Sequence, residues 1–420
     1  MELEDVEPLE HYCPGGYHPI LVGQRLNDRY RIVHKLGYGS YSTTWLSWDE
    51  KSSTYVAIKI GVAEAEYQNE SHILRLLVGT DSDTNTCPGK AFIPKLLDDF
   101  NVQGPNGTHR CLVTTPARMS ISDAREASYK RLFKPAVARA IAAQLVQAVA
   151  FLHSRGVVHS DLHEGNILLG IPKSLDSLPP DKLYEKYSYP ELEKIERLDG
   201  QPLDVGVPTH VVVPIWLGSA CEDVSLDESG IFLTDFGESF LSSTTVRYHS
   251  HTPLILRAPE QLFAPLEPLS LPTDIWALAC ALFAVLGQRP LFESWFPTSD
   301  RVIEEHADAL GRLPMNWWTN WPSRNDYFKE ESLERVDGEV RRHLEERVEY
   351  AIYEPRRKYG TVDAQEPEKI ALTALLKSML TFRPEDRPTA RQVAESDWMV
   401  KWALPELYKV RRMPAAEAIW

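Results

Sequence analysis

The stretch HSDLHEGN, residues 159–166, decides the fold of this 420-residue chain, and it follows a strand-like segment at 156–158. Asp161 can accept a proton from an attacking hydroxyl, and Asn166, five residues later, can bind Mg²⁺. The alternative is a turn whose polar side chains satisfy the local backbone. The spacing favours a catalytic loop, and we therefore predict Asp161 as the base and Asn166 as a metal ligand.

A second acidic residue follows in FLTDFG, residues 232–237. Asp235 is predicted to hold Mg²⁺ against phosphate groups, whereas His159 and Phe236 are predicted to pack rather than react. Because D-x-G is also a common turn sequence, its place after the loop at 159–166 is what supports the prediction.

Upstream, LGYGSYS at residues 36–42 forms a glycine-rich turn between two predicted strands. Glycines let backbone N–H groups approach phosphate oxygens, because no Cβ stands in the way. A hairpin turn without a ligand is the simpler alternative. A dinucleotide site is excluded, since a strand follows where its helix would begin.

Lys59 ends the apolar strand VAIK, residues 56–59, where an ammonium among apolar side chains needs a partner. Glu70, in the helical run NESHIL at 69–74, is the predicted counter-charge. The alternatives are an edge lysine that reaches solvent and a glutamate on an exposed helix face.

Three further motifs follow in order: APE at 258–260, DIW at 274–276 opening an apolar helix, and PEDRP at 384–388. Glu260 and Arg387 are predicted to form a buried ion pair that supports the fold and takes no part in chemistry. Each signal is weak alone, and their common order makes them strong together.

Hydrophobic periodicity predicts a small antiparallel sheet followed by helices. The predicted strands are residues 30–36, 42–49, 55–60 and 111–115, and the predicted helices are residues 63–77, 135–153 and 274–286. Residues 172–229, rich in Pro, Asp and Glu, are predicted to be an insertion into a domain. Within it we predict a helical stretch at 181–198 and a strand-like stretch at 210–217.

Composition describes a folded, soluble protein: 43% of the residues are hydrophobic, 25% charged and 10% aromatic. The net charge of -15 disfavours nucleic acid and favours basic peptides, although a solvated acidic surface is the commoner cause. Five cysteines without CxxC spacing predict neither disulfides nor a zinc site, hence a reducing, intracellular compartment. Residues 1–10 do not resemble a signal peptide, and we expect no apolar run of membrane-spanning length and no membrane partner.

Together these motifs resemble a protein kinase over nearly the whole chain, in particular the SR-protein kinase group and its fungal branch. The resemblance rests on YCPGGYH at 12–18, NDRY at 27–30, KLGYGSYSTTWLSWD at 35–49 and ALGRLP at 309–314. Ser42 in place of a third glycine is a further shared feature. So is the long insertion between Asn166 and Asp235.

The resemblance implies an α+β, two-lobed protein kinase fold, with a small β-rich N-lobe and a larger α-helical C-lobe. Residues 1–115 would form the N-lobe with an N-terminal extension, and residues 116–420 would form the C-lobe. The insertion, at about 171–230, would lie between the catalytic loop and D-F-G.

An ATP site is implied as well. Adenine would lie between Ala57 and Leu168 and along Thr115 to Ala117, with Thr114 at the back of the pocket. The residues implied to bind ATP are Leu36, Gly37, Tyr38, Gly39, Ser40, Tyr41, Ser42, Thr44, Ala57, Lys59, Thr114, Thr115, Ala117 and Leu168. Those implied in catalysis are Asp161, Lys59, Glu70 and His163, and those implied to hold Mg²⁺ are Asn166 and Asp235.

The implied activity is transfer of the ATP γ-phosphate to Ser or Thr of proteins, with Arg/Ser-rich, splicing-type substrates. We expect a monomer in the cytoplasm and nucleus that makes no direct contact with nucleic acid. A helix predicted after Pro297 carries acids where the related kinases have a docking groove for arginine-rich peptides, namely Asp300, Glu304, Glu305 and Asp308. The alternative is a solvated acidic face.

This chain departs from the usual kinase pattern at four positions. Ser160 stands where most kinases have an arginine that pairs with an activation-loop phosphate, and so we predict activity without that phosphorylation. His163 stands where a lysine usually touches the transferred phosphate, and its imidazolium is predicted to take over that contact. Thr44 and Ala279 replace a valine and a glycine.

Two other functions stay open at the level of sequence. A pseudokinase would bind partners, with or without ATP, and transfer nothing. A small-molecule phosphotransferase would share the loop pattern H-x-D-L-H-x-G-N. APE at 258–260 together with Arg387 opposes the second reading, because these features build the peptide-binding lobe of a protein kinase.

Overall fold

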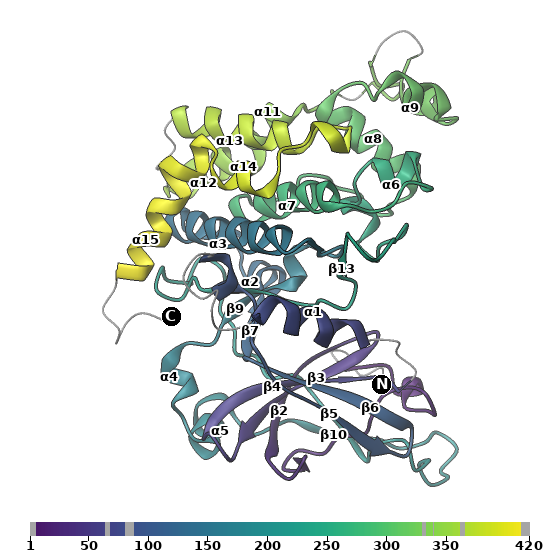
Figure 1. The fold of residues 1–420 in the computed structure, drawn as a ribbon, viewed down its shortest axis with the longest axis vertical. Helices are drawn as coiled ribbons and strands as arrows, with labels where there is room; N and C mark the ends of the chain where they lie inside the picture. Colours follow the sequence, from purple (N-terminus) through teal and green to yellow (C-terminus); the bar gives the residue numbers. More distant parts are fainter. Residues whose placement is uncertain are drawn as a thin grey trace. The chain divides into compact units, whose positions relative to one another are not determined.

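The computed structural model describes residues 6–63, 68–79, 88–329, 333–338, 340–361 and 366–412. Two compact units can be distinguished along the chain (Figure 1). The first comprises Met1–Thr80, Pro94–Met119 and Leu169–Gly218, and the second comprises Asp81–Ile93, Ser120–Leu168 and Ser219–Trp420. The first unit is built on an antiparallel sheet and the second is mostly helical, which confirms the predicted α+β class.

The first unit contains a six-stranded antiparallel sheet in the order β1-β2-β3-β4-β6-β5. Its strands are β1 Arg25–Leu26, β2 Tyr30–Gly39, β3 Ser42–Asp49, β4 Thr54–Gly61, β5 Leu96–Gly104 and β6 Gly107–Thr114. They include the predicted strands, apart from Thr115 at the end of the fourth. The sheet buries an apolar cluster that contains Tyr30, Trp45 and Ile58.

The helix predicted at 63–77 is found as α1, Gln68–Val78, and residues 64–67 of that prediction lie outside the described residues. Arg110 of β6 donates to Ser71 Oγ of α1 and to Asp99 Oδ2 of β5, both at 2.6 Å. These contacts fix α1 against the sheet, which is the position that Glu70 needs in order to reach β4.

The insertion folds onto the sheet of the first unit. It contains α4 Lys173–Asp176, α5 Pro180–Tyr187 and an antiparallel pair, β10 Leu192–Lys194 with β11 His210–Val212. Leu175 and Leu183 are buried in one cluster with Val33, Leu46 and Tyr55 of the sheet. Sequence order assigned these residues to the C-lobe, whereas the structure groups 169–218 with the first unit, because their apolar side chains are buried there.

Two predictions within the insertion were too long. The helix predicted at 181–198 ends at Tyr187, where Ser188 adopts a φ of 70° and Pro190 disfavours helical backbone before it. The strand predicted at 210–217 ends at Val212, since Pro214 lacks the N–H that would continue the ladder.

The second unit consists mainly of helices, with short strands around the loop at 159–166. The helices are α2 Ile121–Glu126, α3 Pro135–Ser154, α6 Glu260–Phe263, α7 Leu271–Leu286, α8 Ser299–Leu310, α9 Met315–Asn320, α10 Arg324–Tyr327, α11 Leu344–Val348, α12 Glu354–Lys358, α13 Glu366–Met379, α14 Ala390–Ala394 and α15 Leu404–Arg412. The short strands of this unit are β8 Val157–Val158, β12 Ile231–Leu233 and β13 Phe240–Leu241, and β13 pairs with β8. The residues of two further short strands, β7 Ala117–Ser120 and β9 Ile167–Gly170, are divided between the two units.

The apolar helix α3 corrects one expectation. By length and composition this 20-residue helix could cross a membrane, although the sequence was expected to contain no such run. Its most apolar window is 78% buried inside the structure, which is the pattern of a core helix. The other long apolar helix, α7, begins with a capping box formed by Ser270 and Thr273 and is buried along nearly its whole length.

The four described cysteines, Cys13, Cys111, Cys221 and Cys280, are free, and Cys87 lies outside the described residues.

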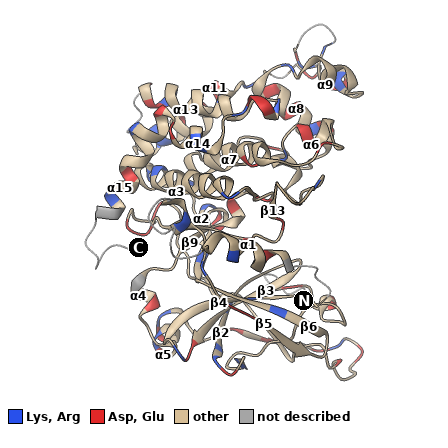
Figure 2. Cartoon of the chain, viewed as in Figure 1, with Lys and Arg blue, Asp and Glu red and all other residues tan. Residues whose placement is uncertain are grey.

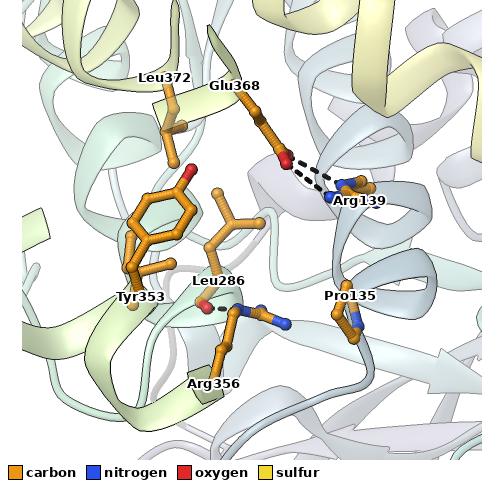
Figure 3. A pocket seen from close by; sticks show the side chains of 8 residues that line it. Pro135, Arg139, Leu286, Tyr353, Arg356, Glu368 and Leu372 are labelled. Atoms are coloured by element: carbon orange, nitrogen blue, oxygen red, sulfur yellow. Dashed lines mark hydrogen bonds and ion pairs between the residues drawn. The ribbon is translucent and has the colours of Figure 1, made fainter. Parts of the chain in front are cut away.

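A small cavity of about 20 Å³ lies in the second unit beside α3 (Figure 3). Arg139 of α3 donates to both carboxylate oxygens of Glu368 in α13, at 2.8 and 2.5 Å. Arg356 of α12 donates to Leu286 O at 2.7 Å. A space of this size holds about one water molecule. The cavity is therefore a feature of packing and is too small for a nucleotide.

Candidate active site

Lys59 and Glu70 form an ion pair inside the first unit. Lys59 Nζ in β4 lies 2.9 Å from Glu70 Oε2 in α1, and only 8% of the Glu70 side chain is exposed. The backbone of Lys59 is fixed on both sides, because β4 pairs with β3 and with β6. The structure thus brings together the lysine and the counter-charge predicted for it, and 28% of the lysine side chain is exposed.

The glycine-rich hairpin, which we define as residues 36–42, joins β2 to β3. Its register pairs are Gly37 with Thr44, Tyr38 with Thr43 and Gly39 with Ser42. A Cβ built on Gly37 or Gly39 would meet no atom within 4 Å, so the space beside this backbone is open. Ser40 and Tyr41 form the exposed tip. Backbone of this kind allows phosphate oxygens to approach N–H groups closely.

The residues implied for adenine lie mostly on neighbouring strands of the first unit. Ala57 of β4 and Thr114 of β6 are register partners. Thr115 N–H donates to Lys95 O at 3.2 Å, which holds the chain just before Ala117 begins β7. Leu168, the remaining residue of this set, lies in β9 within the second unit.

Asp274 of α7 holds the backbone of the loop at 159–166. Its carboxylate accepts the N–H of His159 at 2.7 Å and of Ser160 at 3.0 Å, and a ring nitrogen of His153 lies 3.1 Å away. Ser160 has a φ of 66°, a region that a residue with a Cβ adopts only when its surroundings hold it there. Sequence reasoning had treated Asp274 only as the start of a buried helix. A single acid in an otherwise apolar helix was the available signal, because a buried carboxylate needs donors.

Asp161 and Asn166 contact each other within this loop. Asn166 Nδ2 donates to Asp161 O at 2.9 Å and to Asp161 Oδ2 at 3.2 Å. Asp161 Oδ1 is buried and has no hydrogen-bond partner among the described residues. Because the amino group of Asn166 is engaged, its amide oxygen is the atom left to bind a cation. The arrangement provides one carboxylate oxygen able to accept a proton and one neutral oxygen ligand.

His163 lies beside this pair. Its Nδ1 accepts the N–H of Gly165 at 3.1 Å, and its Nε2 lies 3.8 Å from Asp161 Oδ1. With Nδ1 engaged in this way, Nε2 is the ring nitrogen left to meet a ligand. The phosphate contact predicted for the His163 imidazolium stays a prediction. A Cβ on Gly165 would lie 2.8 Å from His163 Cε1, which explains the glycine.

Asp235 is placed beside Asn166 by the residue that precedes it. The backbone N–H and the hydroxyl of Thr234 both donate to Asn166 O, at 2.9 and 3.0 Å. His159 and Phe236 are fully buried, with ring centroids 5.2 Å apart, and burial lowers the pKa of His159. These two residues pack as predicted.

The donor set fits a magnesium ion that is shared with a nucleotide. Among the described residues, no three His, Cys, Asp or Glu side chains gather into a metal-binding group. Asn166 and Asp235 instead supply one amide oxygen and one carboxylate on neighbouring stretches of backbone. Mg²⁺ is commonly held in this way, by one or two carboxylates plus phosphate oxygens rather than by a complete protein cage.

The segment between D-F-G and A-P-E, residues 238–257, is tied down by ion pairs of its own. Glu238 Oε2 lies 3.0 Å from Arg247 Nη1, and Glu238 Oε1 lies 3.0 Å from His251 Nδ1. Thr252 donates its hydroxyl to Ser160 O at 2.9 Å. Arg247 is one of the cations of this segment that a phosphate could otherwise attract. In the structure it already has a carboxylate partner.

Glu260 and Arg387 form the buried pair that was predicted. Arg387 donates to both oxygens of Glu260, at 2.7 and 2.6 Å, and also to the carbonyl oxygens of Pro272, Thr381 and Phe382. This pair joins α6 to the turn before α14 and to the start of α7, and its role is structural.

Two acids of α8 are buried, and all four have partners within the chain. Glu304 and Asp308 are 3% and 5% exposed, and Arg335 lies between them, at 2.7 Å from Glu304 and 2.8 Å from Asp308. Glu305 contacts Arg347 at 2.7 Å, and Asp300 accepts the Trp321 indole N–H at 2.7 Å. Figure 2 shows this acidic cluster along α8. The face is neither an empty docking groove nor a solvated surface, because the chain's own arginines and a tryptophan occupy it.

Comparisons with known proteins support the reading of these motifs. The protein kinase domain family matches residues 30–175 and 223–399, and the unmatched gap coincides with most of the insertion. The serine/threonine-protein kinase SRPK of Physarum polycephalum is 27% identical over 408 residues, which cover 94% of this chain and 91% of that protein. A serine/threonine protein kinase of Aspergillus fumigatus is 24% identical over 401 residues, or 94% of this chain and 90% of that protein. Human SRSF protein kinase 3 is 35% identical over 170 residues, or 40% of this chain and 30% of that protein.

The family match spans most of the chain and contains Lys59, Glu70, Asp161, Asn166 and Asp235. The order of these residues and the buried pair of Glu260 with Arg387 agree with it. The chain therefore belongs to the protein kinase family, as a serine/threonine kinase of the SR-protein kinase group.

Proposed function

We propose that this kinase transfers the γ-phosphate of ATP to serine or threonine hydroxyls in arginine/serine-rich proteins, with Mg²⁺ as its metal. The observation that carries the proposal is the state of Asp161: one carboxylate oxygen is held by Asn166 and the other has no hydrogen-bond partner among the described residues. A carboxylate in that state can accept the proton of an incoming hydroxyl. A pseudokinase has no need to keep such a group in place.

The described residues have separate tasks in this mechanism. The backbone N–H groups of the glycine-rich hairpin and the Lys59 ammonium bind phosphate oxygens, and Glu70 keeps Lys59 oriented. Asn166 and Asp235 would hold the metal, which would supply positive charge against the phosphates. Asp161 orients the substrate hydroxyl and takes its proton at Oδ1.

Three facts support a preference for arginine-rich substrates. The chain has a net charge of -15, which attracts basic peptides. A relative is named SRSF protein kinase 3. Pairing of carboxylates with a guanidinium is chemistry that this chain already uses, since Glu304 and Asp308 hold its own Arg335.

We further propose a monomer that acts in the cytoplasm and nucleus and binds no nucleic acid directly. The free thiols of the described cysteines suit a reducing compartment, and the acidic net charge disfavours nucleic acid. Light scattering of the purified protein and microscopy of a fluorescent fusion test these statements.

The test of the main proposal is phosphate transfer by the purified full-length chain to a peptide of alternating Arg and Ser. Matched peptides carry Lys for Arg, or Ala for Ser, and Asp161→Asn serves as the inactive control. We expect transfer to the Arg/Ser peptide, a higher Michaelis constant for the Lys peptide, no product with the Ala peptide, and dependence on Mg²⁺. Nucleotide binding without transfer to any peptide would instead support the pseudokinase. Equal rates for the Arg and Lys peptides would remove the substrate class while leaving the kinase activity in place.

A further inference from the structure

The N-terminal segment, residues 6–24, packs against the sheet of the first unit and brings one side chain to the glycine-rich hairpin. Tyr17 is 1% exposed, and its ring lies 5.8 Å from that of His11 and 5.5 Å from that of Tyr12, measured between centroids. Its N–H donates to His11 O at 2.9 Å. The backbone turn before it requires glycine, since a Cβ on Gly16 would lie 1.9 Å from His11 O. Tyr17 is therefore fixed in position.

The hydroxyl of Tyr17 donates to Gly39 O at 2.8 Å. Gly39 lies in the glycine-rich hairpin, where open space surrounds the backbone and the tip is exposed. On the opposite limb, Val62 N–H donates to Tyr41 O at 2.9 Å. A hairpin with so little packing of its own depends on such contacts to remain in one conformation.

Tyr17 is held in turn by the insertion, through Asn106 in the β5–β6 turn. Asn106 is 3% exposed, and its Nδ2 donates to Tyr17 O at 2.7 Å and to Gly206 O at 2.8 Å. The N–H of Gly15 donates to Asn106 O at 2.8 Å. A Cβ on Gly206 would lie 2.0 Å from Asn106 Oδ1, so the insertion approaches this side chain at backbone distance.

From this chain of contacts we infer that Tyr17 is a positioning residue of the nucleotide site, and that the insertion supports it through Asn106. The Tyr17 hydroxyl keeps Gly39 where the neighbouring backbone N–H groups can meet phosphate oxygens. A hairpin ordered before binding loses less conformational freedom when the nucleotide arrives, which raises affinity. The inference rests on nucleotide binding by the hairpin, as in the proposed function, and it gives the insertion a role in that binding.

The test compares two substitutions of the same kind on the full-length chain. Tyr17→Phe removes the hydroxyl that donates to Gly39 O near the tip of β2. Tyr184→Phe removes a hydroxyl of the insertion that donates to Val33 O near the start of the same strand, at 2.9 Å. Each loses one tyrosine-to-carbonyl hydrogen bond, so any general loss of stability should be similar in both.

We expect Tyr17→Phe to raise the dissociation constant for ADP and the Michaelis constant for ATP about fivefold, the effect of one net hydrogen bond. The Michaelis constant for peptide should stay unchanged. Tyr184→Phe should change neither nucleotide constant by more than about twofold. Hydrogen exchange of the amides at 37–42, measured without nucleotide, should accelerate in Tyr17→Phe only. Equal nucleotide constants and equal exchange in the two variants would overturn the inference.

Gly206→Ala tests the support from the insertion, because its Cβ would displace Asn106. We expect weaker ADP binding in Gly206→Ala, and little further loss when Tyr17→Phe is added, since the two changes act through one chain of contacts. Additive losses would show that the insertion does not act through Tyr17. If the unaltered protein bound no ADP, the proposed function itself would fail, and that result is distinct from binding that the variants leave unchanged.

Discussion

His163 and Asp161 lie side by side in the loop at 159–166. The 3.8 Å between His163 Nε2 and Asp161 Oδ1 is too long for a hydrogen bond, so neither atom satisfies the other. Gly165 engages the other ring nitrogen, so the ring has one donor to offer. A ring N–H at this position can bind a phosphate oxygen.

Removal of this donor should slow the chemical step. We expect His163→Ala to lower kcat about tenfold with little change in the Michaelis constant for ATP, because the contact would strengthen as charge moves onto the transferred phosphate. His163→Gln keeps a neutral N–H donor and should retain more of the rate. Steady-state kinetics of the two variants measure this, and an unchanged kcat in His163→Ala would show that the residue is a bystander.

At the scale of elements, the segment at 238–257 contains its own acid. The Glu238 carboxylate contacts Arg247 and His251, so the segment pairs an acid of its own with a cation, as an added phosphate would do. Ser242, whose hydroxyl donates to Gly156 O at 3.1 Å, begins an exposed run of hydroxyl residues that ends at Thr245. Because this contact is made by side chains of the segment itself, it forms without an enzyme that phosphorylates the segment.

The kinase should accordingly be active without phosphate on this segment. We expect protein made in bacteria, treated with phosphatase and shown by mass spectrometry to be bare, to phosphorylate an Arg/Ser peptide. Replacing residues 242–245 together by alanine should keep kcat within about threefold, whereas Glu238→Gln should lower it more, because Arg247 then loses its charged partner. Activity that arises only after phosphorylation at 242–245 would contradict this expectation.

The acidic helix α8 belongs to the same scale, and its buried carboxylates are structural. We expect Glu304→Lys to lower the free energy of unfolding by about 3–5 kcal/mol, since it leaves like charges buried beside Arg335. Asp397→Lys, which reverses the acid of an exposed pair with Lys401, should cost about 1 kcal/mol or less. Urea denaturation measures both. If Glu304→Lys kept its full stability and lost only affinity for Arg/Ser peptides, the helix would be a docking site after all.

For the molecule as a whole, buried histidines couple stability to pH. Burial, and then the charges of Arg387 and Arg347, lower the pKa of His306 to about 3. Burial also lowers the pKa values of His18 and His34 to about 4. Because the folded values lie below the unfolded value near 6.5, the unfolded chain binds more protons between these limits. The free energy of unfolding that depends on these neutral histidines is therefore fully present above pH 6.5, and it is lost as the pH drops below that value.

The contribution of His306 can be isolated, because neither of its ring nitrogens has a hydrogen-bond partner in the described residues and its neighbours are the rings of Trp276 and Phe292. Between pH 7.5 and 5.5 this histidine should account for about 1.4 kcal/mol of lost unfolding free energy. We expect His306→Phe to remove that part of the slope. Urea denaturation between about pH 5.5 and 7.5 measures how the free energy of unfolding changes with pH. An unchanged slope in His306→Phe would contradict the assignment.

The sequence predicted those features that depend on neighbouring residues or on a strong pairing requirement. The loop at 159–166 and the glycine-rich hairpin are short motifs with fixed spacing, and the pairing of Glu260 with Arg387 follows from the cost of burying either alone. The roles of Tyr17 and Asn106 could not be predicted, because each depends on backbone carbonyls contributed by distant segments.

The same reason explains why the acids of α8 and the insertion were misplaced. A run of carboxylates predicts an exposed face unless its partner is known, and Arg335 lies in a separate segment with no local signal. The insertion was assigned by its position in the chain, whereas hydrophobic contacts of Leu175 and Leu183 decide where it packs. Hydrophobic periodicity indicates which residues of one segment are buried, but it does not say which distant segment they pack against.

The need for glycine at position 16 should be visible in the sequences of related kinases. Any side chain at that position would collide with the carbonyl of His11, so the turn that delivers Tyr17 to the hairpin can form only with glycine. A lineage that replaced this glycine would have to abandon the turn, and the selective value of the tyrosine beside it would then disappear. The two residues should therefore be inherited or lost together as a unit. A related gene that keeps Gly16 and Tyr17 but lacks the insertion would indicate that the contact of Tyr17 with the hairpin arose before the support from the insertion.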